Sequence, residues 1–485
     1  MKSKQQQKAG RPAKQGRGEQ APEANKINAA THYDFEGRNL TPYGGLLPAV
    51  TMLEKVGFEA LVAELLRVPR ATRAMPVPKF VLAIVLGIYV GFTRLSHFRF
   101  LAKDPMLTGI LRVAALPVQS TLWRFLASLH RNVSGQLLTL QRQVRERVWA
   151  AAHVRLQSIT IDTDTTVHTV YGKQMGARKS YNPKNKGKRS FQPILTFLAE
   201  TREYLAGQFR NGSQPAGKQI AAHLAEVFRM VPDSVAARFA RADAGFYCWA
   251  AIEAYLRWQC RFVVVARKTA RLLDQLRQAD WQPSPHTDAD AECEFRFQPD
   301  DWGAAFRFVA LRYDEPEEEA EDGTAVQYQL FACGRVKYRV FVTNIEDQPI
   351  DWVVWFYNRR AAAENLIKEA NNDAGLTAHP SGRFPLNAIH FQLAMLAYNL
   401  NCWLLLFQRP EQETVETLKH TMLATARLRF LFVAAKIWRH AGRTGISYAD
   451  HYEEKGLFDR LMRRLRGIVL PGTVGFQPVI PVALE

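Results

Sequence analysis

The sequence predicts an α/β protein built on a mixed sheet, with helices before the sheet and an antiparallel β insertion within it. From about residue 153, alternating β-branched runs come in the order three strands, helix, strand, helix, strand. This order is typical of a sheet with both parallel and antiparallel neighbours. Residues 46–151 instead repeat apolar side chains every three to four positions, which predicts helices. Between 272 and 345, short alternating runs separated by polar turns predict the β insertion.

Composition narrows the class of partner. The 485 residues are enough for two or three domains. Lys and Arg number 64 against 46 Asp and Glu, and the net charge of +18 favours a nucleic-acid partner over a membrane surface. The most apolar run, residues 80–92, is too short to span a bilayer, so we expect no membrane partner. Five cysteines without a CxxC motif disfavour a disulfide framework or structural zinc, and indicate a reducing compartment such as the cytoplasm.

The helical region contains a candidate helix-turn-helix. Its turn lies near Leu116–Pro117, where Pro117 ends one helix. The next helix begins near Gln119 or Ser120, and Ser120 can cap it. A plain α-hairpin explains the pattern equally well. The helix-turn-helix interpretation would expose three polar residues for DNA contact: Gln119, Thr121 and Arg124.

Two predicted strands end in aspartates. Residues 157–164 alternate as a strand, so Asp162 and Asp164 share one face and Asp164 lies at its end. A second strand ends at Asp243 and is followed by a glycine turn and a helix. Strand ends of an open α/β sheet converge on one crevice. If the two strands are neighbours, Asp164 and Asp243 lie close enough to share one cation.

Residues 357–373 carry a third acidic candidate. The stretch is alanine-rich and lacks Gly and Pro, which predicts one helix. Positions three or four apart share a helical face, and here they are polar: Tyr357, Arg360, Glu364 and Lys368. The face is either a solvated surface with charge pairs or a site where Glu364 binds metal and the cations bind phosphate.

Three converging carboxylates would repel one another unless a cation lay between them. Oxygen ligands without His or Cys select a hard ion, Mg²⁺ or Mn²⁺. Two such ions can activate a water or a 3′-hydroxyl and stabilise the leaving oxygen in phosphoryl transfer. The alternative is a scattered trio of surface carboxylates.

Three motifs carry a family resemblance. The triplet Asp164-Thr165-Thr166, the block 241–246 (RADAGF) and the pattern Tyr357-x2-Arg360-x3-Glu364 resemble the D, D and E motifs of DDE transposases of bacterial insertion sequences. They are similar to the cut-and-paste branch that bears the Y-x2-R-x3-E signature. The resemblance covers roughly residues 158–372, and this branch also has a β insertion between its second and third motifs.

The resemblance implies an RNase H-like catalytic core. It implies that Asp164, Asp243 and Glu364 are catalytic and bind Mg²⁺ or Mn²⁺, as two ions. It also implies that Tyr357 and Arg360 contact DNA phosphates near the cleaved end.

The chain departs from the family pattern at one position. The signature usually ends with Lys seven residues after the Glu, and this chain has Asn371 there. Lys368, one helical turn from Glu364, is a possible substitute for DNA contact. Asp162 is a rival to Asp164 as first ligand, and we prefer Asp164 because the Asp-Thr-Thr triplet matches.

A basic loop is expected at the edge of the same crevice. Residues 173–190 are rich in Lys, Arg, Gly and Asn, and phosphate contact is favoured over a solvated loop. The predicted contacts are Lys173, Arg178, Lys179, Lys184, Lys186, Lys188 and Arg189. In the insertion, Trp281 or Trp302 could stack on a flipped base, but packing roles are more usual, so neither is assigned to the site. The acidic stretch 314–322 is interpreted as a solvated loop.

The resemblance implies a DNA transposase. It would bind terminal inverted repeats as a homodimer, cleave double-stranded DNA at the ends of the element and join them to target DNA in the bacterial cytoplasm, at the nucleoid. Two alternatives remain: an RNase H-like nuclease without strand transfer, and a catalytically inactive DNA-binding regulator. A tyrosine recombinase using Tyr357 is disfavoured because the carboxylates would then have no role.

We therefore expect six regions. They are a disordered basic tail (1–30), a helical DNA-binding domain (31–152), the first part of the RNase H-like core (153–271), the β insertion (272–345), the second part of the core (346–410) and a C-terminal region for dimerisation or DNA contact (411–485).

Overall fold

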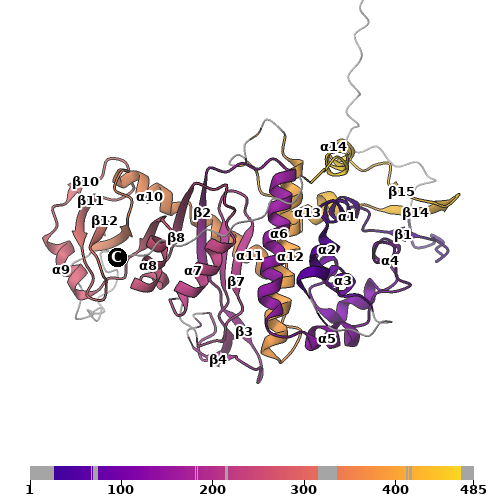
Figure 1. Cartoon of the computed structure of the whole chain (residues 1–485), viewed down its shortest axis with the longest axis horizontal. Helices are drawn as coiled ribbons and strands as arrows, with labels where there is room; N and C mark the ends of the chain where they lie inside the picture. Colours follow the sequence, from indigo (N-terminus) through magenta and orange to yellow (C-terminus); the bar gives the residue numbers. More distant parts are fainter. Residues whose placement is uncertain are drawn as a thin grey trace, which may run out of the picture. The chain divides into compact units, whose positions relative to one another are not determined.

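The computed structural model describes residues 27–66, 68, 75–180, 182, 184–213, 217–314, 336–410, 413, 415 and 418–470. The chain forms two compact units, residues 1–39 and 40–485. Every helix and strand named below belongs to the second unit (Figure 1). The predicted disorder of residues 1–26, the acidic stretch after Asp314 and the part of the predicted β insertion at 315–335 lie outside the described residues.

A nine-stranded mixed sheet forms the centre of the larger unit. From edge to edge its strands are β10 (Gln282–Pro283), β11 (Ala291–Phe297), β12 (Phe306–Asp314), β13 (Val336–Thr343), β9 (Cys260–Val265), β8 (Ala237–Ala242), β2 (Ser158–Thr165), β6 (Ile194–Leu198) and β7 (Tyr204–Gln208). Strands β2, β8 and β9 are parallel, whereas β6 is antiparallel to β2 and β7 to β6. The mixed α/β class is confirmed, and the order β7-β6-β2-β8-β9 is consistent with an RNase H-like core.

Helices cover both faces of this sheet. α7 (Ile220–Arg229) and α8 (Trp249–Arg257) are the crossovers into β8 and β9 and contact each other. Alternate residues of β9 face opposite sides. Phe262 stacks on Tyr255 of α8, whereas Val263 packs with Val353 of α10 (Ile350–Asn358). The strand is therefore buried on both faces, which explains its continuous apolar sequence.

The β insertion continues the core sheet. It begins with α9 (Ala270–Gln278), and its strands are antiparallel as expected. β13 returns to pair with β9, placing Phe341 opposite Val265. The insertion therefore lengthens the sheet instead of forming a separate one.

The N-terminal helices are α1 (Leu46–Lys55), α2 (Phe58–Leu65), α3 (Val77–Tyr89), η2 (Leu95–Phe100), α4 (Pro105–Leu111), α5 (Gln119–Ser128) and α6 (Val133–Ala151). The predicted caps of the candidate helix-turn-helix are wrong. α4 ends at Leu111, well before Pro117. The residue preceding α5 is Val118, and no side chain caps that helix. The helical pattern is confirmed, whereas the choice between helix-turn-helix and α-hairpin stays open.

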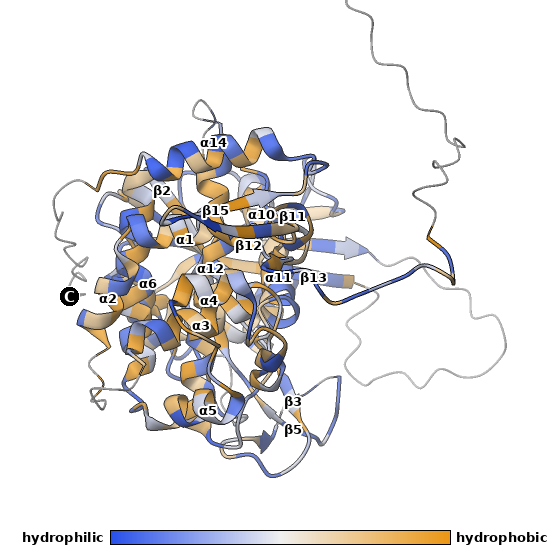
Figure 2. Cartoon of the chain, turned by 90° about the vertical axis from the view of Figure 1, so that its right-hand side faces the viewer, coloured by the Kyte–Doolittle hydropathy of each residue, from blue (hydrophilic) through white to orange (hydrophobic). Residues whose placement is uncertain are grey.

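Helix α12 (Phe384–Gln408) joins the helical region to the sheet. It contacts α3, α6 and β7, and Figure 2 shows its apolar composition. By length and composition it is the one described helix that could cross a membrane, but its apolar window is wholly buried inside the protein. Burial of this kind is typical of a core helix.

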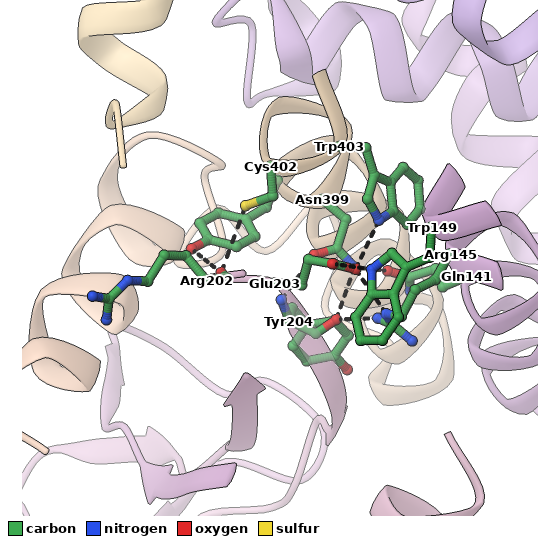
Figure 3. A network of polar contacts seen from close by, with 10 residues as sticks. Gln141, Arg145, Trp149, Arg202, Glu203, Tyr204, Asn399, Cys402 and Trp403 are labelled. Carbon is green, nitrogen blue, oxygen red and sulfur yellow. Dashed lines mark hydrogen bonds and ion pairs between the residues drawn. The ribbon is translucent and has the colours of Figure 1, made fainter. Parts of the chain in front are cut away.

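A buried polar network fastens α6, α12 and β7 together (Figure 3). Arg145 Nε lies 2.7 Å from Glu203 Oε2. The indole nitrogens of Trp149 and Trp403 donate to the same carboxylate at 2.7 and 2.8 Å. Because both carboxylate oxygens accept hydrogen bonds, the buried charge is fully compensated.

Two small sheets complete the unit. One contains β3 (His168–Val170), β5 (Arg189–Phe191) and β4 (Arg178–Lys179), so the expected basic loop holds two short strands. The other contains β1 (Leu40–Thr41), β14 (Ala435–His440) and β15 (Arg443–Tyr448). The remaining elements of the described residues are η3 (Ala244–Phe246), α11 (Ala361–Asn372), α13 (Leu423–Ala426), η5 (Arg427–Leu431) and α14 (Lys455–Arg466).

Candidate active site

Asp164 and Asp243 lie side by side at one end of the central sheet. β2 and β8 are parallel, and their last paired residues are Thr163 and Ala242. Asp164 and Asp243 each follow directly, so they extend the same register. Adjacent strands are about 4.8 Å apart. The expectation that these two strands are neighbours in the sheet is confirmed.

Opposing influences act on the negative charge of Asp164. Its Oδ1 accepts a hydrogen bond from the Thr165 backbone nitrogen at 2.6 Å, and its Oδ2 lies 2.7 Å from Arg360 Nη2. Burial raises the pKa of Asp164 to about 6; Arg360 lowers it and the like charge of Asp243 raises it. Asp243 accepts a hydrogen bond from the Gly245 nitrogen at 2.9 Å. The pair is therefore a concentrated site of negative charge.

The predicted single helix over residues 357–373 is wrong. α10 ends at Asn358 and α11 begins at Ala361, with Arg360 at the junction. The break carries the Arg360 guanidinium to Asp164. Tyr357 belongs to α10 and packs 5.0 Å, centroid to centroid, from Phe341. Burial raises the pKa of the Tyr357 hydroxyl, Arg360 lowers it, and the charges of Asp243 and Asp164 raise it.

Arg360 is a buried cation with spare donors. It is only 7 % exposed. Within the described part of the chain its Nε and Nη2 lack hydrogen-bond partners, although Nη2 lies within ion-pair distance of Asp164. Buried guanidinium donors are normally satisfied. The chemistry that best completes this one is a phosphate oxygen.

Glu364 is not gathered with the two aspartates. It lies exposed in the first turn of α11. Among the described residues no three His, Cys, Asp or Glu side chains are arranged as a metal-binding set. At 3.6 residues per turn, however, Glu364 lies within roughly 40° of both Arg360 and Asn371 around the helix axis. Those two residues contact the end of β2, so Glu364 lies on the side of α11 that bears these two contacts.

Asn371 replaces the signature lysine and has a structural task here. Its Oδ1 is 2.9 Å from His168 Nε2, and its Nδ2 donates to Thr166 Oγ1 at 3.0 Å. Both partners closely follow Asp164, so Asn371 fastens α11 to the segment after the first aspartate. Lys368 is exposed and lines a cavity between α11 and residues 420–424. Its contact with DNA stays a prediction.

The rival ligand Asp162 is fully engaged. Arg241 donates to it through Nε at 2.7 Å and Nη2 at 2.6 Å, and through Nη1 to the Phe356 carbonyl at 2.9 Å. Asp162 is 2 % exposed. This geometry favours Asp164 as the first ligand. Sequence reasoning missed the role of Arg241, although its place two residues before Asp243 puts it opposite Asp162 in the β2–β8 register.

The basic segment follows β3 and extends into β5 in the chain. Lys184, Lys186 and Lys188 are exposed and Arg189 is half-buried in β5. The turn before β5 is fixed because the side-chain amides of Asn182 and Asn185 donate to Thr169 Oγ1 at 2.9 and 3.2 Å. Its cations are thus presented from an ordered turn.

The two tryptophans of the insertion have packing roles. Trp302 is 6 % exposed and its ring lies 4.9 Å from that of Tyr247. Trp281 stacks on Tyr338 at 5.5 Å and donates to the Leu276 carbonyl. These contacts agree with leaving both tryptophans out of the site.

Adjacent strand-end carboxylates beside a buried arginine define a phosphoryl-transfer type of site on a mixed sheet. The family model described as transposase DDE domain group 1 matches residues 24–469, and the chain belongs to this family. It is therefore a DDE transposase, an enzyme that acts on DNA, which confirms the resemblance. Members of the family use divalent metal ions.

Comparison with individual proteins adds little. No curated protein matches the chain. Among solved structures, the chain is similar to that in "Cryo-EM structure of piggyBac transposase synaptic complex with hairpin DNA (SNHP)". The identity is 12 %, the TM-score 0.39, and the match covers 89 % of this chain and 87 % of that one. A TM-score this low does not establish a shared fold.

The aspartate pair fits a hard divalent cation. Both side chains offer carboxylate oxygens, which Mg²⁺ and Mn²⁺ prefer. The raised pKa of Asp164 shows that burial, with the added charge of Asp243, disfavours its ionised form. A cation beside the pair would remove that cost.

Proposed function

We propose that this transposase performs cut-and-paste transposition of a bacterial insertion sequence. It binds the terminal inverted repeats, hydrolyses phosphodiesters at the ends of the element and joins the 3′-hydroxyls to target DNA. The observation that carries the proposal is the register of β2 and β8, which sets Asp164 beside Asp243 with Arg360 against them. The location is the bacterial cytoplasm, at the nucleoid.

In this proposal Asp164, Asp243 and Glu364 hold two Mg²⁺ or Mn²⁺ ions. When bound, the ions activate the attacking water or hydroxyl and stabilise the leaving oxygen. Glu364 approaches the aspartates from its exposed place on α11. Arg360 then exchanges Asp164 for a DNA phosphate, which satisfies its spare donors. Tyr357 orients that phosphate through its hydroxyl.

Further cations position the duplex. Lys184, Lys186, Lys188 and Arg189 contact phosphates along the small sheet, and Lys368 contacts them from α11. The helical region 31–152 binds the inverted repeats, and the segment 411–485 contributes to a homodimer or to DNA contact. The core proper comprises residues 153–271 and 346–410.

The DNA that flanks the gene is first searched for short inverted repeats. The proposal is then tested by measuring cleavage of a plasmid that carries these flanking sequences. Asp164→Ala, Asp243→Ala and Glu364→Ala should abolish cleavage and leave binding to the repeats intact. Asp274→Ala is the matched control, because Asp274 is also an exposed carboxylate on a helix, in the β insertion, to which no DNA contact is assigned. Undiminished cleavage in EDTA or by the three variants would contradict the proposal.

A second assay separates a transposase from a nuclease. The protein is incubated with pre-cut ends and a target plasmid. Joined products are expected, whereas cleavage without joining would identify an RNase H-like nuclease. Binding without either reaction would identify an inactive regulator.

A further inference from the structure

A cavity of about 620 Å³ lies beside the junction of α10 and α11, away from the carboxylate pair. Its wall includes Ser158 and Thr160 from the beginning of β2, so it opens toward the opposite end of the strand from Asp164. Aromatic and basic side chains line the rest, including Phe239, Trp352, Trp355, Arg202 and Arg359.

Packing explains one tryptophan of this cavity but not the other. Trp352 stacks on Phe356, with ring centroids 4.9 Å apart and an interplanar angle of 5°. Trp355 is 51 % exposed, although it lies on the same helix. The guanidinium of Arg359, one helical turn later, lies 4.9 Å from its ring centroid. A large aromatic face is thus held at the cavity beside a cation.

The charge of the cavity favours an anion. Arg202 and Arg359 both line it. Figure 3 shows the guanidinium of Arg202 directed away from the buried polar network. The carboxylate of Glu200 is engaged, because both of its oxygens accept from the Thr160 backbone nitrogen at 2.9 and 3.0 Å. Arg241 at the cavity wall is balanced by Asp162. Arg202 and Arg359 thus face the single carboxylate of Glu200, and the lining keeps an excess of one positive charge.

The cavity and the carboxylate pair share one face of the sheet. Thr160, Asp162 and Asp164 alternate along β2 and so point to the same side. The Asp162–Arg241 ion pair separates the cavity from Asp164. Four residues of strand span about 13 Å. Two consecutive arginines contact the cavity and the carboxylate pair, respectively. Arg359 lies over Trp355, and Arg360 lies against Asp164.

We propose that this cavity binds an unpaired nucleotide of a DNA strand engaged at the carboxylate pair. The base stacks on the exposed face of Trp355, and Arg359 and Arg202 contact its flanking phosphates. Stacking on an aromatic face suits any base, so the site has little sequence preference. The proposal rests on the proposed function, because it takes the occupant to be part of the DNA substrate.

Binding of a short oligothymidylate by the full-length protein, measured by fluorescence anisotropy in EDTA, tests the site. Trp355→Ala should weaken binding about tenfold. Trp355→Phe should retain most of the affinity because it keeps an aromatic face. The matched control is Trp281→Ala, since Trp281 is a partly exposed tryptophan of the β insertion, to which no DNA contact is assigned. Equal affinities for Trp355→Ala and Trp281→Ala, with both proteins folded, would overturn the proposal.

Photocrosslinking locates the base directly. An oligonucleotide containing 5-iododeoxyuridine is irradiated with the Asp164→Ala protein, and the adduct is mapped by mass spectrometry. The expected adduct is on the peptide that contains Trp355; adducts only elsewhere would contradict the site. Neither experiment needs metal or cleavage. If the oligonucleotide does not bind or crosslink at Trp355 but the wild-type protein cleaves DNA, only the proposal for the cavity is refuted. If it crosslinks at Trp355 but the wild-type protein does not cleave DNA, only the transposition proposal is refuted.

Discussion

Asp162 and Asp164 lie two residues apart on one face of β2, and each is paired with an arginine. Asp162 receives two hydrogen bonds from Arg241 and is 2 % exposed. Asp164 has a single close contact with Arg360, and its side chain remains 17 % exposed. Asp162 is thus buried and Asp164 partly buried, and their contacts with arginine differ as well. What differs is whether the arginine occupies both carboxylate oxygens.

The fully buried pair of Arg145 and Glu203 resembles Asp162 in this respect. Glu203 also has both oxygens engaged, by Arg145 and two indoles (Figure 3). Such carboxylates join separate elements, because side chains or distant segments engage both of their oxygens. The Oδ1 of Asp164 instead accepts only from the backbone nitrogen of the next residue, Thr165. Asp164, beside a second carboxylate and an arginine with spare donors, retains the capacity to exchange partners.

The largest difference is expected in catalysis. Asp164→Asn should lower DNA cleavage by about 10³-fold or more, because the amide is a poor ligand for a hard cation. The protein should stay folded and bind DNA as wild type does. Cleavage rates on plasmid DNA, with circular dichroism for folding, measure this. If the Asp164→Asn protein is folded and cleaves DNA at the wild-type rate, Asp164 is not a catalytic residue, and the proposed difference in role between Asp162 and Asp164 is wrong.

The second difference is in stability. Asp162→Asn should cost about 3–5 kcal/mol of unfolding free energy, since it leaves the Arg241 charge buried without its partner. Urea denaturation measures the change. The double variant Asp162→Leu/Arg241→Met should recover part of the loss, because apolar side chains need no counter-charge. If Asp162→Asn unfolds at the urea concentration of wild type, the pair does not hold β2 to β8 as inferred.

A smaller effect concerns pH. Folding raises the pKa of Asp164 from its usual 3.8 to about 6. Between these values the folded protein binds more protons than the unfolded chain, so wild type loses stability as pH rises through this window. Relative to wild type, Asp164→Asn should gain about 2 kcal/mol between pH 4 and pH 7. Denaturation in EDTA at several pH values measures this. A pH-independent difference would show that the carboxyl group is not perturbed.

The smallest effect is expected at Asn371. Asn371→Ala removes its contacts with Thr166 and His168 and should cost about 1–2 kcal/mol of stability. Cleavage should fall as well, because α11 then positions Glu364 less firmly. Asn365→Ala, an exposed asparagine on the same helix, is the control. Equal stabilities of the two variants would show that Asn371 does not anchor the helix.

Local patterns predicted the strands and the adjacency of Asp164 and Asp243. Alternation marks a strand, and strand-end residues of parallel neighbours meet at one edge. The break between α10 and α11 was not predictable, because residues 357–373 contain good helix formers throughout. The pairings Asp162–Arg241 and Asp164–Arg360, and the return of β13 to β9, depend on long-range register that one sequence does not display. Trp355 and Arg359 do carry a signal, since an aromatic and a cation four residues apart share a helical face.

A crystal of the protein soaked in Mn²⁺ and measured by anomalous diffraction tests the distinction between the two aspartates most directly. A Mn²⁺ peak is predicted between Asp164 and Asp243, with Arg360 displaced from Asp164 and Asp162 still bound to Arg241. A fully occupied Mn²⁺ site elsewhere, with density between Asp164 and Asp243 empty, would contradict the account.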